Sequence, residues 1–278
     1  VASDKKASAI AIMFTGLTVA TILGVPFGTW LAQHFGWRAT FWAVTLVGVV
    51  AFAIIAALVP ASKSEPEPFN LREDLAVLKR GPVLAGLLTT VLGWVGVFAV
   101  FTYLAPLLTK VTGFSDAAVS PILLVVGIGL LVGNLLGGRF ADKRLIPTVF
   151  GSLFTLALVL ALMTFVLHDK IAMVIFAGLF GVAAFATAPP LQMWVLDKAH
   201  GAGQSLASSF NIAAFNLGNA IGAWLGGVVI DRGPGLESVP WIAALVPLTG
   251  LLLAVASHRL EMRRARLVPA AVCPAAAE

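Results

Sequence analysis

The sequence has little charge and almost no cysteine. Only 11% of its 278 residues are charged, and its eight longest apolar runs contain no Asp, Glu, Lys or Arg. Cys273 is the single cysteine, which excludes an internal disulfide. The four histidines lie singly near the ends of apolar runs, with no metal-ligand spacing between them. These absences argue against a metal site, a cofactor site and an enzyme active site in this chain.

What is abundant is apolar sequence. Hydrophobic residues make up 59% of the chain, and the mean hydropathy is +0.99, which is more than a soluble core of this size buries. The apolar runs are continuous and near twenty residues long, the length at which a helix crosses a bilayer. The sequence therefore predicts an all-α polytopic membrane protein with eight transmembrane helices, at residues 9–31, 39–59, 83–108, 119–138, 148–167, 171–196, 205–230 and 239–256.

The basic residues are distributed unevenly among the segments between these spans. Fourteen of the eighteen fall on one side of the membrane, and the other side carries only Arg38, Lys110, Lys170 and Arg232. By the positive-inside rule, both termini are expected in the cytoplasm. The protein itself is expected in a plasma membrane or bacterial inner membrane. The basic residues behind the net charge of +5 lie in these loops and not on one soluble face, so we expect no nucleic acid as partner. The expected surroundings are the lipid bilayer, and the expected oligomeric state is a monomer.

Two apolar spans share one pattern of glycines. A shift of 194 positions places Gly218, Gly222, Trp224 and Leu225 on Gly24, Gly28, Trp30 and Leu31. One interpretation is a duplication, because many secondary transporters consist of two halves built alike. The other is convergence, because glycines spaced by four are common wherever membrane helices pack closely.

Glycines and prolines mark further positions in the spans. Glycine frames predict helix-packing faces at Gly129, Gly133 and Gly137 and at Gly218, Gly222 and Gly226. Pro189 and Pro190, in the span at residues 171–196, predict a bend that frees backbone carbonyl groups. Three asparagines surround the second glycine frame and either hold helices together or face a substrate path: Asn211, Asn216 and Asn219.

The first span carries a motif with two interpretations, plain helix packing or a special role. Its residues Gly16, Gly24, Pro26 and Gly28 resemble the antiporter signature in the fifth helix of the major facilitator superfamily. The string G-W-R-A-T-F-W at 36–42 is similar to the entry into the sixth helix of the twelve-helix drug:proton antiporters and their arabinose-efflux-permease-like relatives. The resemblance implies helices 5–12 of that fold.

This resemblance also implies a domain organisation. Residues 1–60 would hold the last two helices of the N-terminal half, 61–82 the cytoplasmic linker, 83–257 the C-terminal six-helix half and 258–278 a cytoplasmic tail. The repeat aligns residue 1 with residue 195, whereas the second half begins near residue 83. The difference is 112 residues, or about four spans at bilayer-crossing length, so we expect an N-terminally truncated carrier.

The segment after the span at 119–138 is basic and contains one aspartate. It resembles the cytoplasmic Gly-x-x-x-Asp-Arg/Lys motif of the superfamily and consists of Gly138, Arg139, Asp142, Lys143 and Arg144. An aspartate among basic residues at a helix end is able to form a latch whose pairing changes between conformations. The later residues of the family motif are absent, which leaves a plain positive-inside loop as the alternative.

The charge-free spans predict the chemistry of a transport pathway. Proton relays need an ionisable group in the membrane, so we expect the coupling carboxylate in helices outside this chain. Apolar and weakly polar walls suit neutral or lipophilic substrates. The candidate substrate-binding residues are Trp94, Phe101, Tyr103, Asn134, Gln192 and Asn211. Helix packing is the alternative role for each, and Trp94, in the middle of its span, is the strongest candidate.

The resemblance implies a membrane transporter that works by alternating access, with proton-coupled efflux of a small neutral or lipophilic compound, a drug or a sugar. A role in drug resistance follows from the same family. The residues themselves support a transporter through the repeat, the kinked spans and the lack of a sizeable soluble domain. The alternative is a non-transporting polytopic membrane protein with a receptor-like or structural role.

Overall fold

The computed structural model describes residues 6–58, 76, 80–199 and 203–267. These residues are mainly helical and form no strand. Most of the expected linker at 61–82 and the end of the expected tail lie outside them. The helical elements are α1 (Lys6–Phe35), α2 (Trp37–Leu58), α4 (Gly81–Pro106), η2 (Leu107–Val111), α5 (Asp116–Lys143), α6 (Leu145–Met163), η3 (Thr164–Val166), α7 (Lys170–Phe185), α8 (Ala188–Lys198), α9 (Gln204–Arg232), η4 (Leu236–Ser238) and α10 (Val239–Leu267).

The predicted all-α polytopic fold is confirmed. Among the described residues, seven helical segments are long and apolar enough to cross a membrane: Trp37–Leu58, Gly81–Val111, Asp116–Lys143, Leu145–Val166, Lys170–Lys198, Gln204–Arg232 and Leu236–Arg264. The first expected span, at 9–31, forms the 30-residue helix α1, which is not among these seven. Its crossing of the membrane stays a prediction. Helix α10 continues to Leu267, so the start of the expected tail at 258–278 is helical.

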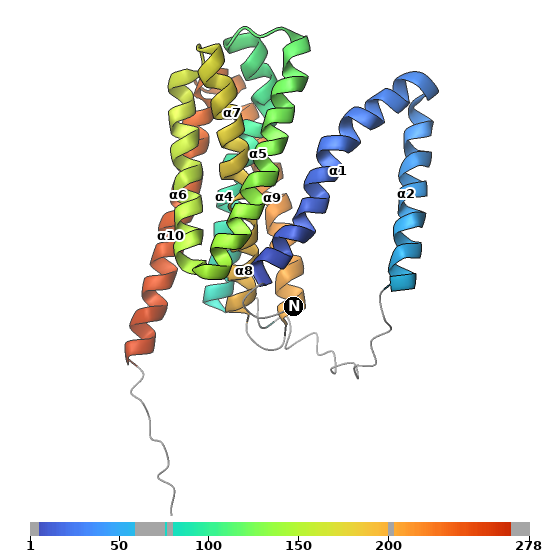
Figure 1. The fold of residues 1–278 in the computed structure, drawn as a ribbon. Helices are drawn as coiled ribbons and strands as arrows, with labels where there is room; N and C mark the ends of the chain where they lie inside the picture. The colour runs from blue at the N-terminus through green and yellow to red at the C-terminus, as the bar shows by residue number, and fades with distance from the viewer. Residues whose placement is uncertain (1–5, 59–75, 77–79, 200–202, 268–278) are drawn as a thin grey trace, which may run out of the picture.

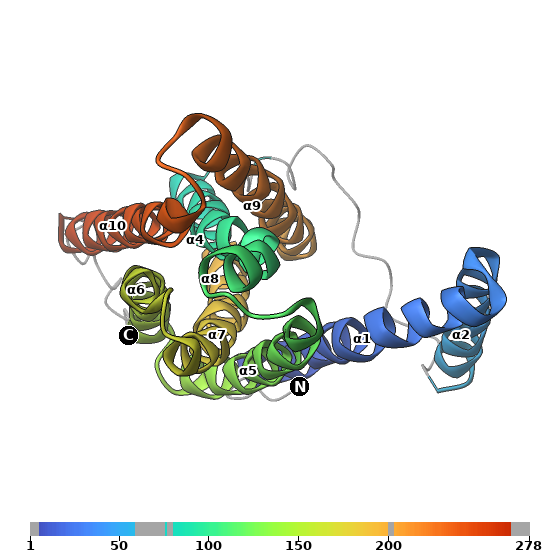
Figure 2. The ribbon, with the colours of Figure 1, turned by 90° about the horizontal axis from the view of Figure 1, so that it is seen from above.

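Helices α4 to α10 form one bundle, and α1 and α2 stand beside it (Figure 1). Within the bundle α4 packs mainly on α9 and α10, and α5 mainly on α7. Helix α1 lies against α5 near its N-terminus and then leans away from the bundle, as both views show (Figures 1 and 2). Helix α2 packs on α1, and none of its residues is buried. Its apolar surface is therefore left for lipid or another protein segment.

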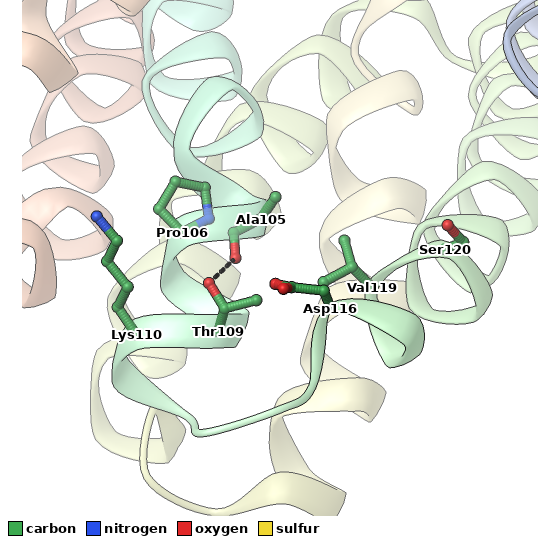
Figure 3. A pocket seen from close by; sticks show the side chains of 7 residues that line it. All are labelled: Ala105, Pro106, Thr109, Lys110, Asp116, Val119 and Ser120. Carbon is green, nitrogen blue, oxygen red and sulfur yellow. Dashed lines mark hydrogen bonds between the residues drawn. The ribbon is translucent and has the colours of Figure 1, made fainter. Parts of the chain in front are cut away.

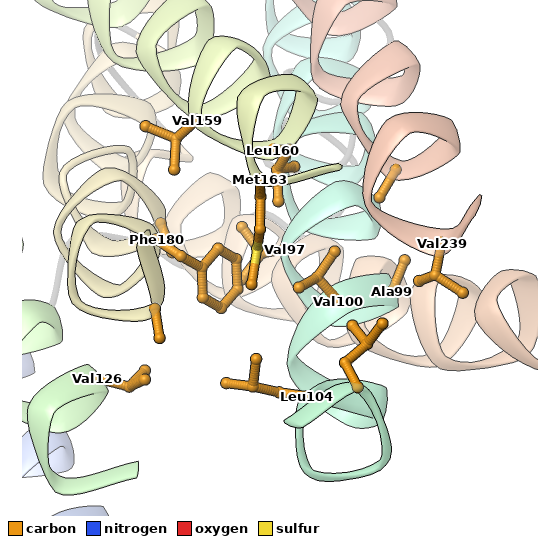
Figure 4. Close-up of a cluster of buried hydrophobic side chains, with 14 of the residues drawn as sticks. Val97, Ala99, Val100, Leu104, Val126, Val159, Leu160, Met163, Phe180 and Val239 are labelled. Carbon is orange, nitrogen blue, oxygen red and sulfur yellow. The ribbon is translucent and has the colours of Figure 1, made fainter. Parts of the chain in front are cut away.

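Large apolar side chains fill the centre of the bundle (Figure 4). Phe180 of α7, Met163 of α6 and Leu104 of α4 are completely buried there. Val126 of α5 reaches the same cluster. In a bilayer the surrounding lipid is as apolar as these side chains, so close van der Waals packing holds the helices together.

The glycines of α5 lie where this helix crosses α7. A Cβ atom on Gly137 would lie 2.5 Å from the carbonyl oxygen of Ala186, much closer than atoms can approach. Gly129 and Gly133 face the carbonyl groups of Gly178 and Val182 in the same way. The predicted packing face thus lies at a crossing where two backbones touch.

The second glycine frame lies where α9 crosses α4. A Cβ atom on Gly222 would lie 2.5 Å from the carbonyl oxygen of Val95, and one on Gly218 would lie 2.9 Å from the Trp94 Cβ. Gly226 faces the ring of Tyr103, at 2.5 Å from its Cε2 atom. This frame lets α9 approach the middle of α4, which carries Trp94.

The expected span at 171–196 is interrupted, as its prolines predict. Helix α7 ends at Phe185 and α8 starts at Ala188. Pro189 and Pro190 lie in the first turn of α8. Backbone N–H groups in the first turn of a helix have no acceptor within the helix, so proline loses no hydrogen bond there. Thr187 turns its hydroxyl back onto the carbonyl oxygen of Ala184, at 2.6 Å. The bend brings Phe185 and Gln192 to the interior from two separate helices.

Candidate functional site

A cluster of aromatic rings surrounds Trp94 in the middle of α4. Its indole packs on Phe98 of the same helix at 5.9 Å between ring centroids, on Phe185 of α7 at 5.4 Å and on Phe215 of α9 at 4.7 Å. Phe14 of α1 meets Phe215 edge to face at 6.4 Å. We call these five residues the aromatic cluster. It is one place where α1 contacts the bundle.

The indole of Trp94 is 7% exposed. Its Nε1 atom is buried and has no hydrogen-bond partner among the described residues. An indole N–H group normally finds an acceptor when it is buried, because the unpaired donor costs about 1 to 3 kcal/mol. Phe14, Phe98 and Phe185 are only partly buried. The cluster therefore combines accessible ring surface with one unused donor.

An amide cluster lies beside it, formed by Gln192 of α8 with Ser208 and Asn211 of α9. Gln192 donates from Nε2 to the Ser208 hydroxyl at 2.8 Å and accepts from Asn211 Nδ2 at 2.7 Å. Asn211 Oδ1 is buried without a partner among the described residues. Asn211 lies one helical turn before Phe215, so the amide cluster and the aromatic cluster share one face of α9.

Asn134, also expected to bind substrate, lies between two helices. It is completely buried in α5 and donates from Nδ2 to the carbonyl oxygen of Ala11 in α1 at 2.6 Å and to the Thr15 hydroxyl at 3.3 Å. These bonds occupy its donor group in the contact between α1 and α5. Its Oδ1 atom has no partner among the described residues.

Phe101 and Tyr103 follow the aromatic cluster along α4. Phe101 contacts Phe98 at 5.6 Å and is half-buried. The hydroxyl of Tyr103 donates to the carbonyl oxygen of Ala223 in α9 at 3.0 Å. Of the six substrate-binding candidates, the structure brings Trp94, Gln192 and Asn211 to neighbouring clusters, and it places Asn134 and Tyr103 in contacts between helices.

Sequence reasoning missed Phe14, Phe215 and Ser208 as members of this region. A signal was present in the spacing, because Trp94 and Phe98 are four residues apart and so are Asn211 and Phe215. Residues four apart lie on one face of a helix. The approach of Phe14 had no such signal, because nothing in the sequence relates α1 to this part of α9.

The predicted cytoplasmic motif is part of helix α5 and not a loop, since α5 extends to Lys143 and only Arg144 connects it to α6. Gly138 is buried in the helix. Asp142 accepts hydrogen bonds from the backbone N–H of Ser8, at 3.0 Å, and from the Ser8 hydroxyl. A carboxylate at the start of α1 is favoured by the positive end of the helix dipole. The residue expected to form a latch therefore connects α5 to α1.

The glycines of the antiporter-like motif in α1 have few close neighbours among the described residues. A Cβ atom on Gly16 or Gly24 would meet nothing within 4 Å among the described residues, and one on Gly28 would lie 3.5 Å from Thr40 Cγ2. Pro26 lies inside α1. The repeat partners Gly218 and Gly222 are tightly packed, so equivalent glycines have unequal surroundings.

A hollow of about 370 Å³ lies between the end of α4 and the start of α5 (Figure 3), at the opposite end of α5 from Asp142. The π-helical turn η2 carries Thr109, whose hydroxyl bonds the carbonyl oxygen of Ala105 at 3.1 Å. The other residues lining it are Pro106, Lys110, Asp116, Val119 and Ser120. Within the part of the chain that is described, His, Cys, Asp and Glu form no group of three able to hold a metal.

Comparison with known proteins identifies the family. Residues 1–210 match the sequence profile of the Major Facilitator Superfamily. The uncharacterized MFS-type transporter YtbD of Bacillus subtilis is 41% identical over 95% of this chain and 67% of its own length. The inner membrane transport protein YdhP of Escherichia coli is 41% identical over 93% and 66%, and a chloramphenicol resistance protein of Streptomyces lividans 33% identical over 91% and 65%.

The chain spans about two thirds of the length of these relatives. It is an integral membrane protein, and it belongs to the Major Facilitator Superfamily of transporters.

Proposed function

We propose that this chain supplies helices 5–12 of a carrier that exports a small neutral or lipophilic compound in exchange for protons, by alternating access. The observation that carries the substrate class is the aromatic cluster, in which Trp94 is surrounded by phenylalanines from α4, α7 and α9. Aromatic faces bind apolar, planar molecules by stacking and edge contacts. No charged side chain lies in the expected spans to select an ion.

The buried polar atoms support a substrate that also forms hydrogen bonds. Trp94 Nε1 offers a donor and Asn211 Oδ1 an acceptor, both without a partner in the described part of the chain. A ligand that pairs these atoms would remove the cost of burying them unpaired. A neutral molecule with an aromatic ring, an oxygen that accepts from Trp94 and an O–H or N–H group that donates to Asn211 satisfies both requirements. The resistance to chloramphenicol that gives the Streptomyces relative its name supports this chemical class.

Movement of the two halves would use the contact between α1 and the bundle. Phe14 of α1 packs on Phe215 of the bundle within the aromatic cluster, and Ser8 binds Asp142. If α1 belongs to the first half, separating the halves breaks these contacts and exposes the cluster to the other side of the membrane. A latch role for Asp142 is part of this proposal. The coupling carboxylate would come from helices of the first half, because none lies in the expected spans of this chain.

Transport of chloramphenicol into everted membrane vesicles with an imposed pH gradient tests the proposal. The chain, and separately the chain within its complete carrier, would be compared with vesicles that lack it. Trp94→Ala should reduce uptake by about tenfold, because losing a stacking surface and a donor costs roughly 1 to 2 kcal/mol. Trp224→Ala is the matched control, since Trp224 is 67% exposed on α9.

The outcomes separate the parts of the proposal. Equal uptake by Trp94→Ala and Trp224→Ala vesicles would remove the aromatic cluster as the substrate site. Uptake that persists after the pH gradient is collapsed would contradict proton coupling. If the complete carrier moves no compound of this class, a non-transporting membrane protein becomes the better description.

A further inference from the structure

A second hollow lies on the seam between α1 and α5, at the end of the bundle where α1 begins. Its volume is about 420 Å³, and its lining comes from both helices: Ser8, Ala11, Ile12, Leu135, Arg139, Asp142 and Lys143. We call it the seam hollow. On α1 it borders the aromatic cluster, because Phe14 lies two residues after Ile12, but the transport mechanism above does not use its basic residues.

The apolar part of the seam hollow is open to the outside of the bundle. Ile12 is 68% exposed and Leu135 is 45% exposed. Their neighbours Leu136 and Phe140 extend the exposed apolar surface along α5. In a membrane protein, exposed apolar side chains face acyl chains or another apolar segment.

The polar end of the seam hollow is basic. Arg139 and Lys143 are exposed and lie four residues apart, so both project from one face of the last turn of α5. Neither forms an ion pair with any carboxylate in the described part of the chain. The carboxylate of Asp142 also lines the seam hollow and accepts hydrogen bonds from Ser8 at the start of α1. Two cations therefore border an apolar surface.

We propose that the seam hollow binds an anionic phospholipid of the cytoplasmic leaflet. Arg139 and Lys143 hold its phosphate, and an acyl chain lies over Ile12 and Leu135. Basic pockets between membrane helices on the cytoplasmic side bind anionic headgroups, and each basic residue near the surface raises lipid binding about fivefold. The lipid contacts both helices, so it bridges α1 and α5 beside the bond from Ser8 to Asp142. The leaflet rests on the proposed orientation, whereas binding does not rest on transport.

Photolabelling in liposomes tests this site directly. The protein is reconstituted with phosphatidylglycerol that carries a diazirine on its acyl chain, or with matched diazirine phosphatidylcholine, and labelled peptides are identified by mass spectrometry. Phosphatidylglycerol should label the peptides around Ile12 and Leu135 at least about fivefold more than phosphatidylcholine does. Arg139→Gln with Lys143→Gln should abolish that preference. The control, Arg259→Gln with Arg263→Gln, changes the same charge on exposed residues of α10 and should keep it.

Several outcomes overturn the proposal. Equal labelling by both lipids, or a preference that survives the Arg139 and Lys143 changes, would mean that the seam hollow selects no anionic lipid. Loss of the preference on adding inorganic phosphate would indicate a site for soluble phosphate. If the double glutamine variant fails to fold, Arg139→Lys with Lys143→Arg keeps both charges and should retain the preference. The labelling is repeated with the diazirine phosphatidylglycerol confined to one leaflet of the liposome and then to the other. This comparison shows whether a negative result comes from a wrong orientation of the protein or from the absence of binding.

Discussion

Asn134 of α5 donates a hydrogen bond of 2.6 Å to the backbone carbonyl oxygen of Ala11 in α1. The bond from Ser8 to Asp142 lies two turns further along α5, on the same side of α1. Two polar contacts therefore fix the first part of α1 to the bundle. The rest of α1 leans away from the bundle (Figure 1), with open space around Gly16 and Gly24 within the described residues.

Replacing Asn134 by leucine should loosen α1. The change removes hydrogen bonds between helices, which in membrane proteins are worth about 0.6 kcal/mol on average and at most roughly 1.7 kcal/mol. A thermal unfolding curve of the purified protein in detergent should shift to lower temperature by a few degrees. Asn216→Leu is the control, because Asn216 is exposed and, among the described residues, its side chain bonds only the Ile212 carbonyl of its own helix. A larger loss in the control would contradict this role of Asn134.

The repeated glycines should respond unequally to alanine. At Gly222 the new methyl group would meet the Val95 carbonyl oxygen at 2.5 Å, so α9 must move away from α4. Overpacking of this kind costs about 1 to 3 kcal/mol. At Gly28 the nearest atom is Thr40 Cγ2 at 3.5 Å, an ordinary contact, and alanine favours the helix by roughly 0.5 to 1 kcal/mol.

The stabilities of Gly222→Ala and Gly28→Ala, measured by titration with a denaturing detergent, test this difference. Gly151→Ala is a second control, since nothing lies within 4 Å of its Cβ position among the described residues. Equal effects at Gly222 and Gly28 would show that the crossing of α4 and α9 adapts to a methyl group. In the complete carrier, Gly24→Leu or Gly28→Leu should damage transport more than membrane insertion.

Gln192 and Asn211 should act as a coupled pair. Asn211→Leu leaves the buried Gln192 Oε1 without its 2.7 Å donor, which costs about 1 to 3 kcal/mol. Adding Gln192→Leu removes the stranded acceptor, so the double variant should lose less than the two single variants together. A double-mutant cycle on unfolding free energy measures the coupling, expected at about 0.5 to 3 kcal/mol. Additive losses would mean that this hydrogen bond contributes nothing.

The single cysteine allows a test of orientation. Cys273 lies near the end of the sequence, which the basic residues predict to be cytoplasmic. A membrane-impermeant maleimide should leave Cys273 unlabelled in intact spheroplasts and label it after the membrane is permeabilised. Labelling of intact spheroplasts would place the C-terminus outside. The cytoplasmic position of the seam hollow would then be wrong, although its lipid contacts could still be tested.

Local sequence predicted most of the helices because each feature acts within a single span. Apolar runs of bilayer length form helices. Pro189 and Pro190 interrupt one run, because proline has no backbone N–H group to continue the hydrogen bonds of a helix. The glycine frames of α5 and α9 indicated close crossings, because only glycine leaves room for a second backbone. The apolar run at 9–31 forms the 30-residue helix α1, and its crossing of the membrane remains a prediction.

The sequence by itself determined the all-helical class, the breaks and the residues able to pack closely. Only the tertiary structure decided which neighbour each residue meets. Gly222 lies against the backbone of α4, whereas a Cβ atom on Gly28 would make only an ordinary contact. Asn134 forms a hydrogen bond to α1, whereas Asn211 forms one to Gln192. It also brought Phe14 of α1 to Phe215 of α9. The physical reason is that hydrophobicity, glycine spacing and proline act along one helix, whereas a hydrogen bond or a ring contact depends on a partner that the fold brings from far away in the chain.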